Sequence, residues 1–269
     1  MNSWIDGVPT QSLGVSDRGL NLADGHFTTM LVREGEVALW SLHRQRLSQA
    51  CSRLLMAQPD WDQVEATLKQ ATSGQQGLMV AKLLFTRGEQ GRGYAASLHQ
   101  PPRIILTLHP YPVHYLQWQT QGIRVGLADL VLGNQPALAG LKTLGRTEQV
   151  LHRAEVDACS ADELVALDPQ GRILETSAAN LFLCQGRVLM TPSLHRGGVA
   201  GVMRQQILRL APELGWRIEV RDLSRPDLLQ AEAAFISNSL MGLVPITELA
   251  GRELTESAAL RSLQEALAL

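Results

Sequence analysis

Short apolar runs with strand periodicity, joined in pairs across tight turns, are the feature that most restricts how this chain can fold. In residues 26–40 two such runs meet across residues 33–35, where Gly35 can take the left-handed conformation that a tight hairpin needs. Residues 164–178 and 180–193 have the same organisation. Strand-like and helical segments are mixed with these hairpins, so strands and helices do not alternate strictly. The pattern therefore favours the α+β class over a doubly wound parallel sheet.

Apolar residues that recur at intervals of three and four predict the main helices. One helix is expected over about 41–56, with Ser41 as its N-cap, and another over about 59–72, with Asp60 as its N-cap. Further helices are expected at 147–160, 202–211 and 255–267, and strong strands at 78–88, 103–111 and 123–132.

The pattern weakens once near the middle of the chain. Residues 113–122 are polar and aromatic without a clear period, and we interpret them as a linker. They separate a smaller N-terminal α/β domain, residues 1–112, from a larger C-terminal domain, residues 123–269. A length of 269 residues agrees with one large domain or two smaller ones.

Composition and charge exclude several classes of protein. With 45% hydrophobic and 19% charged residues, the chain is neither disordered, nor collagenous, nor a coiled coil. A net charge of −2 opposes a general attraction to nucleic acid or to an anionic membrane surface. An arginine-rich protein that binds nucleic acid or another partner without catalysis stays open only as a third alternative, because basic clusters are absent from the sequence.

The cysteines and the first residues bear on the compartment. Cys51, Cys159 and Cys184 are odd in number and form no CxxC pair, so we expect neither a disulfide framework nor a zinc site, and no metal. The segment MNSWIDGVPTQ lacks the features of a signal peptide, and no apolar run reaches the roughly 18 residues of a membrane span. These features predict a cytoplasmic protein without membrane contact.

Only three lysines are available if the chemistry requires a side-chain amine. Lys142 lies in a loop between Leu141 and Leu144, where apolar neighbours would lower the pKa of the amine and make it a nucleophile or a base. A solvated surface lysine is the alternative at this position. Lys69, on the polar side of a helix, is expected to be solvated, and Lys82, inside an apolar strand, is expected to extend to a sheet edge.

Three further features suit an anionic cofactor with a ring nitrogen. Glu175 ends an apolar strand, and a buried carboxylate there would require a protonated nitrogen beside it. The turn HRGGVAG leads into the helix at 202–211, whose free N–H groups can bind phosphate. Arg46 follows His43 by one helical turn and offers a fork for phosphate. With the amine of Lys142, these are the parts that hold pyridoxal phosphate.

Segments spread over the whole chain resemble the fold-type IV pyridoxal phosphate enzymes, the group of the branched-chain aminotransferases, D-amino acid aminotransferases and aminodeoxychorismate lyases. The segments are SDRGLNLADGHFTTMLV, LHRQRL, LAGLKTLGR, ETSAANLF, GVAGVMR and SNSLMGLVPI. The resemblance implies a small-molecule substrate, a homodimer, a larger C-terminal domain with a barrel-like sheet, and pyridoxal 5′-phosphate bound at the domain boundary.

The resemblance also implies a role for individual residues. Lys142 resembles the lysine that forms the Schiff base with the cofactor, and Glu175 resembles the acid that keeps the pyridine nitrogen protonated. Arg46 resembles the phosphate-binding arginine. Further cofactor contacts correspond to the backbone of Val202 and Met203, to Asn238 and Ser239 in the loop that closes the phosphate site, and to Asn180 as a supporting residue.

Within this group the details resemble the aminodeoxychorismate lyases. The loop RGEQGRGY and the segment SNSLMGLVP fit that subgroup better than the aminotransferases, whereas Ala23 departs from the glycine that many relatives carry there. The resemblance implies conversion of 4-amino-4-deoxychorismate to 4-aminobenzoate and pyruvate, a step of folate biosynthesis. An aminotransferase acting on branched-chain or D-amino acids is the alternative. The implied catalytic residues are Lys142 and Thr29, and the implied substrate-binding residues are Thr28, Arg87 and Arg92.

Overall fold

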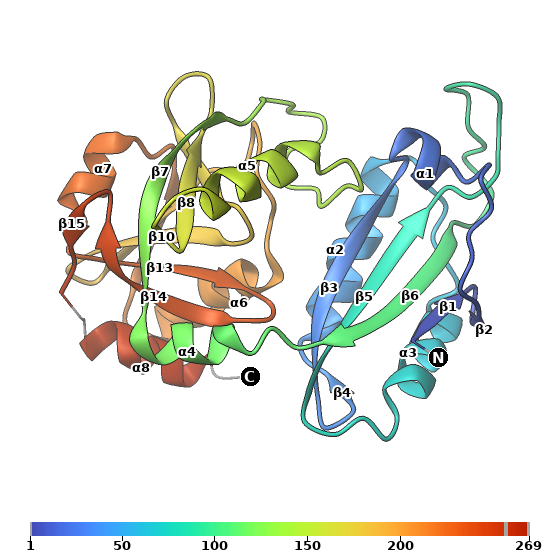
Figure 1. Cartoon of the computed structure of the whole chain (residues 1–269), viewed down its shortest axis with the longest axis horizontal. Coiled ribbons are helices and arrows are strands. Elements are labelled where there is room, and N and C mark those ends of the chain that lie inside the picture. The colour runs from blue at the N-terminus through green and yellow to red at the C-terminus, as the bar shows by residue number, and fades with distance from the viewer. Residues whose placement is uncertain (1, 256–257, 268–269) are drawn as a thin grey trace. The chain divides into compact units, whose positions relative to one another are not determined.

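The computed structural model of the chain describes residues 2–255 and 258–267. They form two compact units. The first unit runs to Pro112 and includes the separate segment Lys142–Gly145, whereas the second comprises Val113–Leu141 and the described residues from Arg146 onward. Each unit has its own sheet with helices beside it (Figure 1), so the predicted α+β class is confirmed.

The sheet of the first unit has six strands in the order β2-β1-β6-β5-β3-β4, and every neighbouring pair is antiparallel. The predicted hairpin is confirmed, because Glu34 and Gly35 both take positive φ values, 47° and 82°, between β3 and β4. The strands are β1 (Ser3–Ile5), β2 (Val8–Pro9), β3 (Gly25–Arg33), β4 (Glu36–Val37), β5 (Leu78–Thr86) and β6 (Arg103–Pro110).

The helices of this unit are α1 (Arg18–Leu22), α2 (Trp40–Arg53) and α3 (Trp61–Thr72). The predicted N-cap of α3 is confirmed, since the side chain of Asp60 accepts hydrogen bonds from the backbone N–H groups of Asp62 and Gln63. The predicted N-cap Ser41 is wrong. Leu39 takes a left-handed conformation after β4 and its carbonyl accepts the first helical hydrogen bonds, so α2 begins at Trp40 without a side-chain cap.

The two faces of this sheet have different surroundings because side chains alternate along a strand. On one face Met30, Leu83 and Leu106 pack with Leu47 of α2 and Leu68 of α3 in a buried apolar cluster. Figure 1 shows α2 running beside β3. On the other face Leu31 and Val80 are buried, but six of the alternate residues are only partly buried. They are Phe27, Thr29, Lys82, Leu84, Ile105 and Thr107.

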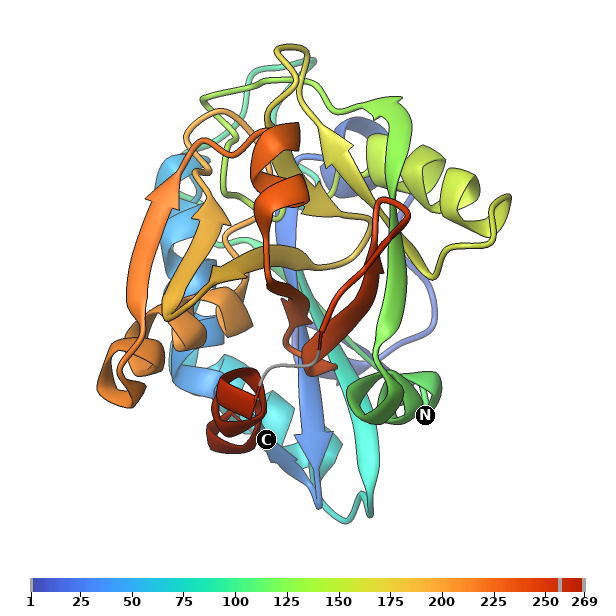
Figure 2. The same cartoon turned by 90° about the vertical axis from the view of Figure 1, so that its left-hand side faces the viewer.

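The sheet of the second unit follows the order β12-β11-β10-β13-β14-β7-β8-β9, and β15 pairs with β14. The last strand, β9, also contacts β10 and β11, so the sheet curls on itself, as the view onto this unit in Figure 2 shows. The strands are β7 (Ile123–Val131), β8 (Glu163–Leu167), β9 (Ile173–Thr176), β10 (Asn180–Gln185), β11 (Val188–Pro192), β12 (Arg217–Arg221), β13 (Ala233–Asn238), β14 (Gly242–Leu249) and β15 (Arg252–Glu253).

The residues expected to form a linker instead begin the second unit with a helix. Tyr115 and Trp118 of α4 lie one turn apart and pack against the buried cluster of the curled sheet. Two apolar contacts in eight residues are too few to give a visible period, so packing rather than sequence pattern defines this helix. The helices of this unit are α4 (His114–Gln121), α5 (Thr147–Asp157), α6 (Val202–Leu210), α7 (Arg225–Gln230) and α8 (Ala258–Ala266), with a 3-10 turn at Ala211–Leu214.

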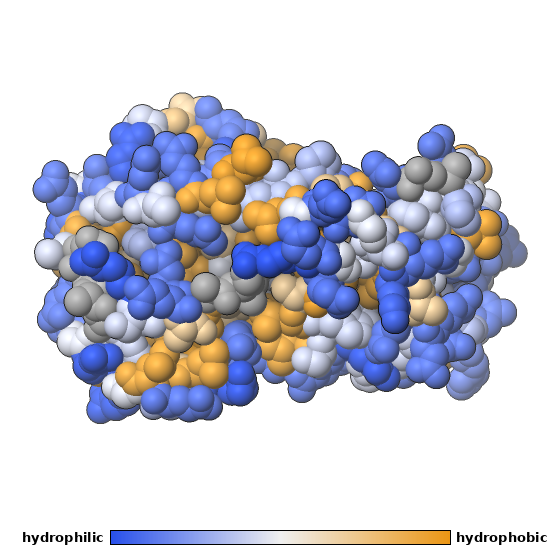
Figure 3. All heavy atoms as spheres, turned by 90° about the horizontal axis from the view of Figure 1, so that it is seen from below, coloured by the Kyte–Doolittle hydropathy of each residue, from blue (hydrophilic) through white to orange (hydrophobic). Residues whose placement is uncertain are grey.

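The surface seen from below carries mainly hydrophilic side chains, with apolar ones in small groups (Figure 3). Scattered apolar residues are ordinary for a protein surface. Val113 and Leu116, at the start of α4, are examples of such exposed residues. In the described part of the chain, no helix combines the length and the apolar character that crossing a membrane requires.

Two histidines are buried in the first unit. His26 on β3 is 1% exposed, and its Nε2 lies 3.3 Å from Cys51 Sγ. Burial, and to a lesser degree the charge of Arg46, lower the pKa of His26 to about 4. The same two causes hold the pKa of His43 well below its ordinary value. Both rings are therefore neutral at pH 7.

The buried His26 predicts a loss of stability in acid. Below pH 6.5 the unfolded chain takes up a proton that folded His26 accepts only near pH 4, so the free energy of unfolding falls across this interval, by roughly 3 kcal/mol. We expect His26→Gln to lose less stability than the wild type between pH 7 and pH 4, measured by urea unfolding. His99→Gln, at an exposed histidine, is the control. Equal pH dependence in wild type and His26→Gln would contradict the argument.

Candidate functional site

Lys142 is held on the first unit by backbone pairing with β3. Phe27 N donates a hydrogen bond to Lys142 O at 2.9 Å, Leu144 N donates to Gly25 O at 3.0 Å, and His26 forms an antiparallel bridge with Thr143. Lys142 therefore stands opposite Phe27 across the pair, so both side chains lie on the partly buried face of the sheet. The Lys142 Nζ is 4.6 Å from the centroid of the Phe27 ring.

This pairing requires a glycine at position 25. A Cβ atom there would lie 2.1 Å from Phe85 O and 2.8 Å from a methyl carbon of Leu144. The nearby Ala23, which departs from the family pattern, ends α1 in a left-handed conformation with φ 53°. Glycine is the usual residue for such a helix end, which agrees with the glycine that the family resemblance leads one to expect there. Alanine can adopt this conformation, so the departure leaves the loop intact.

Thr28 and Thr29 point to opposite faces of β3. Thr28 is fully buried beneath α2, where its Oγ1 accepts a hydrogen bond from Arg46 Nη2 and lies 2.6 Å from His43 Nδ1. These contacts make Thr28 a residue that positions Arg46, so its predicted contact with substrate is not supported. Thr29 lies on the partly buried face, which it shares with Lys142.

Arg87 is also committed to the fold. Its Nε donates to both carboxylate oxygens of Asp24, at 2.9 and 3.1 Å, and its two terminal nitrogens donate to the carbonyls of Leu54 and Leu55 beyond α2. The side chain is buried, and its hydrogen bonds fix the end of α2 to the start of β3. Arg87 is therefore structural, and the expectation that it binds substrate is corrected. Arg92 lies exposed in the loop between β5 and β6.

Sequence reasoning missed Arg18, which shapes that loop. Its Nη1 donates to three loop carbonyls, those of Gln90, Gly93 and Ala95, at 2.8 to 3.2 Å, and its Nε donates to Asp24 at 2.9 Å. Asp24 thus pairs with two buried arginines, Arg18 and Arg87. A helix of five residues with one buried side chain has no periodicity, so only the adjacent SDRG and ADG segments could have suggested the network.

In the second unit, a single turn joins Glu175 to Asn180. Glu175 on β9 is buried, and its Oε2 accepts a hydrogen bond from Val199 N at 2.8 Å. Asn180 on β10 donates from Nδ2 to Val199 O, also at 2.8 Å. Arg146 lies near enough to Glu175 for the carboxylate to favour the charged guanidinium, although burial is the larger influence and lowers the pKa of Arg146.

The segment that contains Val199 leads into α6, whose first N–H groups have no side-chain cap. Gly201 is the N-cap residue, and a Cβ atom there would lie 2.1 Å from Asn180 Oδ1. Val202 and Met203 open the helix with buried side chains, so their backbone, not their side chains, can face a ligand. An uncapped helix start beside a glycine is suited to bind phosphate. The buried carboxylate of Glu175 is suited to a protonated ring nitrogen.

Asn238 and Ser239 form the turn between β13 and β14. Asn238 Oδ1 accepts hydrogen bonds from the backbone of Leu240 and Met241, both at 2.8 Å, and its Nδ2 donates to Ala178 O at 3.2 Å. The Asn238 side chain is therefore used to shape the turn. Ser239, which this turn presents, is partly buried.

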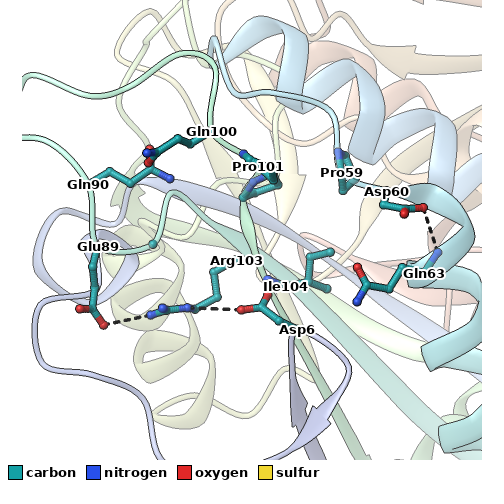
Figure 4. A pocket seen from close by; sticks show the side chains of 12 residues that line it. Asp6, Pro59, Asp60, Gln63, Glu89, Gln90, Gln100, Pro101, Arg103 and Ile104 are labelled. Carbon is teal, nitrogen blue, oxygen red and sulfur yellow. Dashed lines mark hydrogen bonds and ion pairs between the residues drawn. The ribbon is translucent and has the colours of Figure 1, made fainter.

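The first unit also has a hollow of about 440 Å³ that contains none of the predicted site residues (Figure 4). Its charged groups pair with one another, because Arg103 contacts Glu89 at 3.2 Å and Asp6 at 3.7 Å. Asp60 is used as the N-cap of α3. Within residues 2–255 and 258–267, no three or more His, Cys, Asp or Glu side chains are grouped to hold a metal ion.

The sequence of residues 25–249 matches the amino-transferase class IV family, and the chain belongs to this family. Its fold is accordingly the fold-type IV architecture, with a smaller unit and a larger one that contains a curled sheet.

Two similar proteins are lyases. The chain is 35% identical over 255 residues to an aminodeoxychorismate lyase from Vibrio harveyi, covering 93% of this chain and 92% of the relative. The crystal structure of 4-amino-4-deoxychorismate lyase from Pseudomonas aeruginosa superimposes with a TM-score of 0.89 and 39% identity, over 98% of this chain and 97% of the other. A hypothetical aminotransferase from Mycobacterium tuberculosis in a PLP-bound form has the same fold, with a TM-score of 0.87 and 19% identity over 99% and 97%.

The contact between positions 180 and 201 predicts a specific mutational coupling. The φ of Gly201 is −65°, which alanine adopts easily, so Gly201→Ala acts only through the clash with Asn180. We expect a loss of roughly 1–3 kcal/mol in the free energy of unfolding, the usual range for overpacking. Asn180→Ala in the same chain removes the clashing oxygen and should recover part of this loss. Additive effects in the double-mutant cycle, measured by urea unfolding, would refute the contact.

Proposed function

We propose that this protein is a pyridoxal phosphate-dependent lyase that converts 4-amino-4-deoxychorismate to 4-aminobenzoate and pyruvate. The observation that carries the proposal is the backbone pairing that fixes Lys142 beside Phe27, on the face that also presents Thr29. Of the three lysines, Lys142 is the one that a loop holds in register against a sheet. The likeness to two aminodeoxychorismate lyases over nearly the whole chain supports the choice of substrate.

The residues in each unit fit parts of the cofactor. In the first unit, Lys142 would attach it covalently, and Arg46, held by Thr28, would bind its phosphate. In the second unit, the uncapped backbone at Val202 and Met203 would also bind phosphate. Glu175 would hold the proton on the ring nitrogen.

The two asparagines that the family resemblance implies as cofactor contacts would act by shaping turns of the chain. Asn180 anchors the turn before α6 through Val199, and Asn238 shapes the turn that presents Ser239. These two asparagines would thus act as supporting residues rather than as groups that react.

The chain's own groups would then move the protons of the reaction. When bound, pyridoxal phosphate supplies an electron-withdrawing ring for the carbon that bears the substrate nitrogen. The amine of Lys142, released when substrate takes its place, would remove the proton from that carbon. Thr29, on the same face, would hold a proton near the departing pyruvate. Loss of pyruvate leaves an aromatic ring, which favours the forward direction.

Transamination is the second candidate, because the family as a whole is that of the class IV aminotransferases. An aminotransferase would need a keto acid as acceptor and would pass the amino group through the cofactor. The discriminating experiment uses purified protein, pyridoxal phosphate and 4-amino-4-deoxychorismate without keto acid. Equal amounts of 4-aminobenzoate and pyruvate support the lyase. No product, together with a keto-acid-dependent loss of the pyridoxal absorption band, supports the aminotransferase.

Two variants test the assigned roles. Lys142→Ala should lose nearly all turnover, by a factor on the order of 10³ or more, because it removes both the attachment point and the base. Glu175→Gln should retain bound cofactor but turn over more slowly, because a neutral amide no longer favours a protonated ring nitrogen. Cofactor content is read from the absorption spectrum and turnover from product formation. Normal turnover of Lys142→Ala would disprove the assignment.

We also propose that the protein is a homodimer whose interface includes α1 and the loop between β5 and β6. These segments adjoin each other, since Arg18 of α1 binds three carbonyls of the loop. Together they expose apolar side chains, of which Tyr94 is 92% exposed. An exposed apolar group of this kind favours a protein interface. The residues are Leu20, Leu22, Tyr94 and Leu98, together with Val15 just before α1.

Charge placed on this apolar group should weaken the dimer. We expect Leu20→Glu with Tyr94→Glu to shift the molar mass measured by light scattering from that of a dimer toward that of a monomer, because an interface does not readily bury an unpaired carboxylate. Leu229→Glu, at an exposed leucine of α7 in the second unit, is the matched control. A monomeric wild type, or a dimer unaffected by the double substitution, would contradict this interface.

A further inference from the structure

Glu163, at the start of β8, is a carboxylate with no part in the proposed chemistry, yet it is only 1% exposed. Its Oε2 accepts a hydrogen bond from Ser177 N at 3.0 Å, and its Oε1 accepts one from Ser177 Oγ at 2.8 Å. Arg153 is its ion-pair partner, with Nη1 at 3.8 Å and a half-exposed side chain. Because burial of a carboxylate is unfavourable unless its oxygens are bonded, Glu163 and Ser177 are held firmly together.

Ser177 lies in the turn that joins Glu175, the proposed acid for the ring nitrogen, to Asn180. The antiparallel pairing of β8 with β9 ends at Thr176, one residue before this serine. Directly beyond that end, the Glu163 carboxylate takes the place of a backbone carbonyl and accepts the hydrogen bond of Ser177 N. The side chain therefore continues the attachment of the turn to β8 where the backbone pairing stops.

A second side chain holds the same turn from another strand. Asn238, at the end of β13, donates from Nδ2 to Ala178 O at 3.2 Å. Asn238 also forms a side-chain hydrogen bond with Tyr115 of α4. Two successive residues of the turn, Ser177 and Ala178, are thus bonded to side chains of β8 and β13. Glu163 accounts for the two shorter of these three bonds, and both come from Ser177.

We propose that Glu163 is a positioning residue that keeps Glu175 in the orientation needed to hold the proton on the ring nitrogen of pyridoxal phosphate. This inference rests on the proposed function. The backbone after Glu175 passes within two residues into the serine that Glu163 holds, while Glu175 Oε2 accepts a hydrogen bond from Val199 N at 2.8 Å. Hydrogen bonds weaken steeply when they are misaligned, so a loosened turn would weaken the contact between Glu175 and the ring nitrogen.

The test compares Glu163→Ala, Glu163→Gln and Asp227→Ala as holoenzymes. Asp227 is the matched control, because its carboxylate likewise accepts hydrogen bonds from N and Oγ of one serine, Ser224, at 2.8 and 2.9 Å. It does so at the start of α7, which contains none of the proposed site residues. Glutamine at position 163 can still accept from Ser177 N and can donate to the hydroxyl.

We expect Glu163→Ala to lower kcat for 4-amino-4-deoxychorismate about 10- to 100-fold, the order of effect of a small misplacement of a catalytic group, with a smaller change in KM. Glu163→Gln should recover most of this loss. Asp227→Ala should keep the kcat of the wild type, although its unfolding temperature falls. Ser177→Ala, which removes only the hydroxyl contact, should lower kcat in the same direction by a smaller factor.

Hydrogen exchange supplies a readout that does not depend on turnover. The N–H of Val199 donates to Glu175, so its exchange with solvent reports how firmly the carboxylate is held. In the full-length Glu163→Ala chain this amide should exchange about 10-fold faster than in the wild type, the order expected when one hydrogen bond is lost. In Asp227→Ala its rate should stay unchanged. A merely stabilising role of Glu163 would instead make the two alanine variants behave alike.

The outcomes separate the two proposals. If the wild type forms 4-aminobenzoate and Glu163→Ala has the kcat and the Val199 exchange rate of Asp227→Ala, the role of Glu163 is refuted and the lyase function stands. If the wild type forms no product but Val199 exchanges faster only in Glu163→Ala, the lyase function fails and the positioning of Glu175 stands. Should Glu163→Ala not fold, Ser177→Ala decides, and wild-type values of both measurements in that variant overturn the proposal.

Discussion

The pairing of residues 142–144 with β3 is the constraint on which the candidate site depends. After β3 ends at Arg33, the chain forms the remaining strands of the first sheet and the first strand of the second sheet. At Lys142 it returns and pairs with β3. Backbone pairing fixes not only the position of Lys142 but also its face, because a shift by one residue would turn its side chain to the helix-covered side. Gly25 makes this approach possible, since any side chain there would collide with Phe85 and Leu144.

Polar residues near this pairing divide into two groups by their surroundings. On the helix-covered side the polar groups bond to one another. Thr28 contacts Arg46 and His43, and Arg87 forms an ion pair with Asp24. Those on the other side, such as Thr29 and Lys82, are only half-buried and lie on the face that also carries Lys142. The two neighbouring threonines show the division most directly, because alternation along a strand gives adjacent residues opposite environments.

Much of the fold could be predicted from the sequence because its signals are local. The hairpin around Gly35 and the capped start of α3 depend on residues within a few positions of each other. The beginning of α2 could not be predicted, since a left-handed Leu39 after β4 decides it, nor could α4, which two aromatic contacts with a distant cluster define. The assignment of Arg87 failed for a similar reason, because its partners lie 32, 33 and 63 residues away in the chain.

The sequence by itself determined the class of fold, the motifs of the family and the small set of residues able to carry the chemistry, including a single plausible lysine. These features are encoded in residue type, periodicity and short spacing. Tertiary structure alone decided which arginines and threonines form bonds within the fold. It also decided on which face of the sheet Lys142 lies, and that Lys82 lies on the same face. The physical reason is that burial and pairing are properties of residues far apart in the chain. Their chemical character is visible in the sequence, but their partners are not.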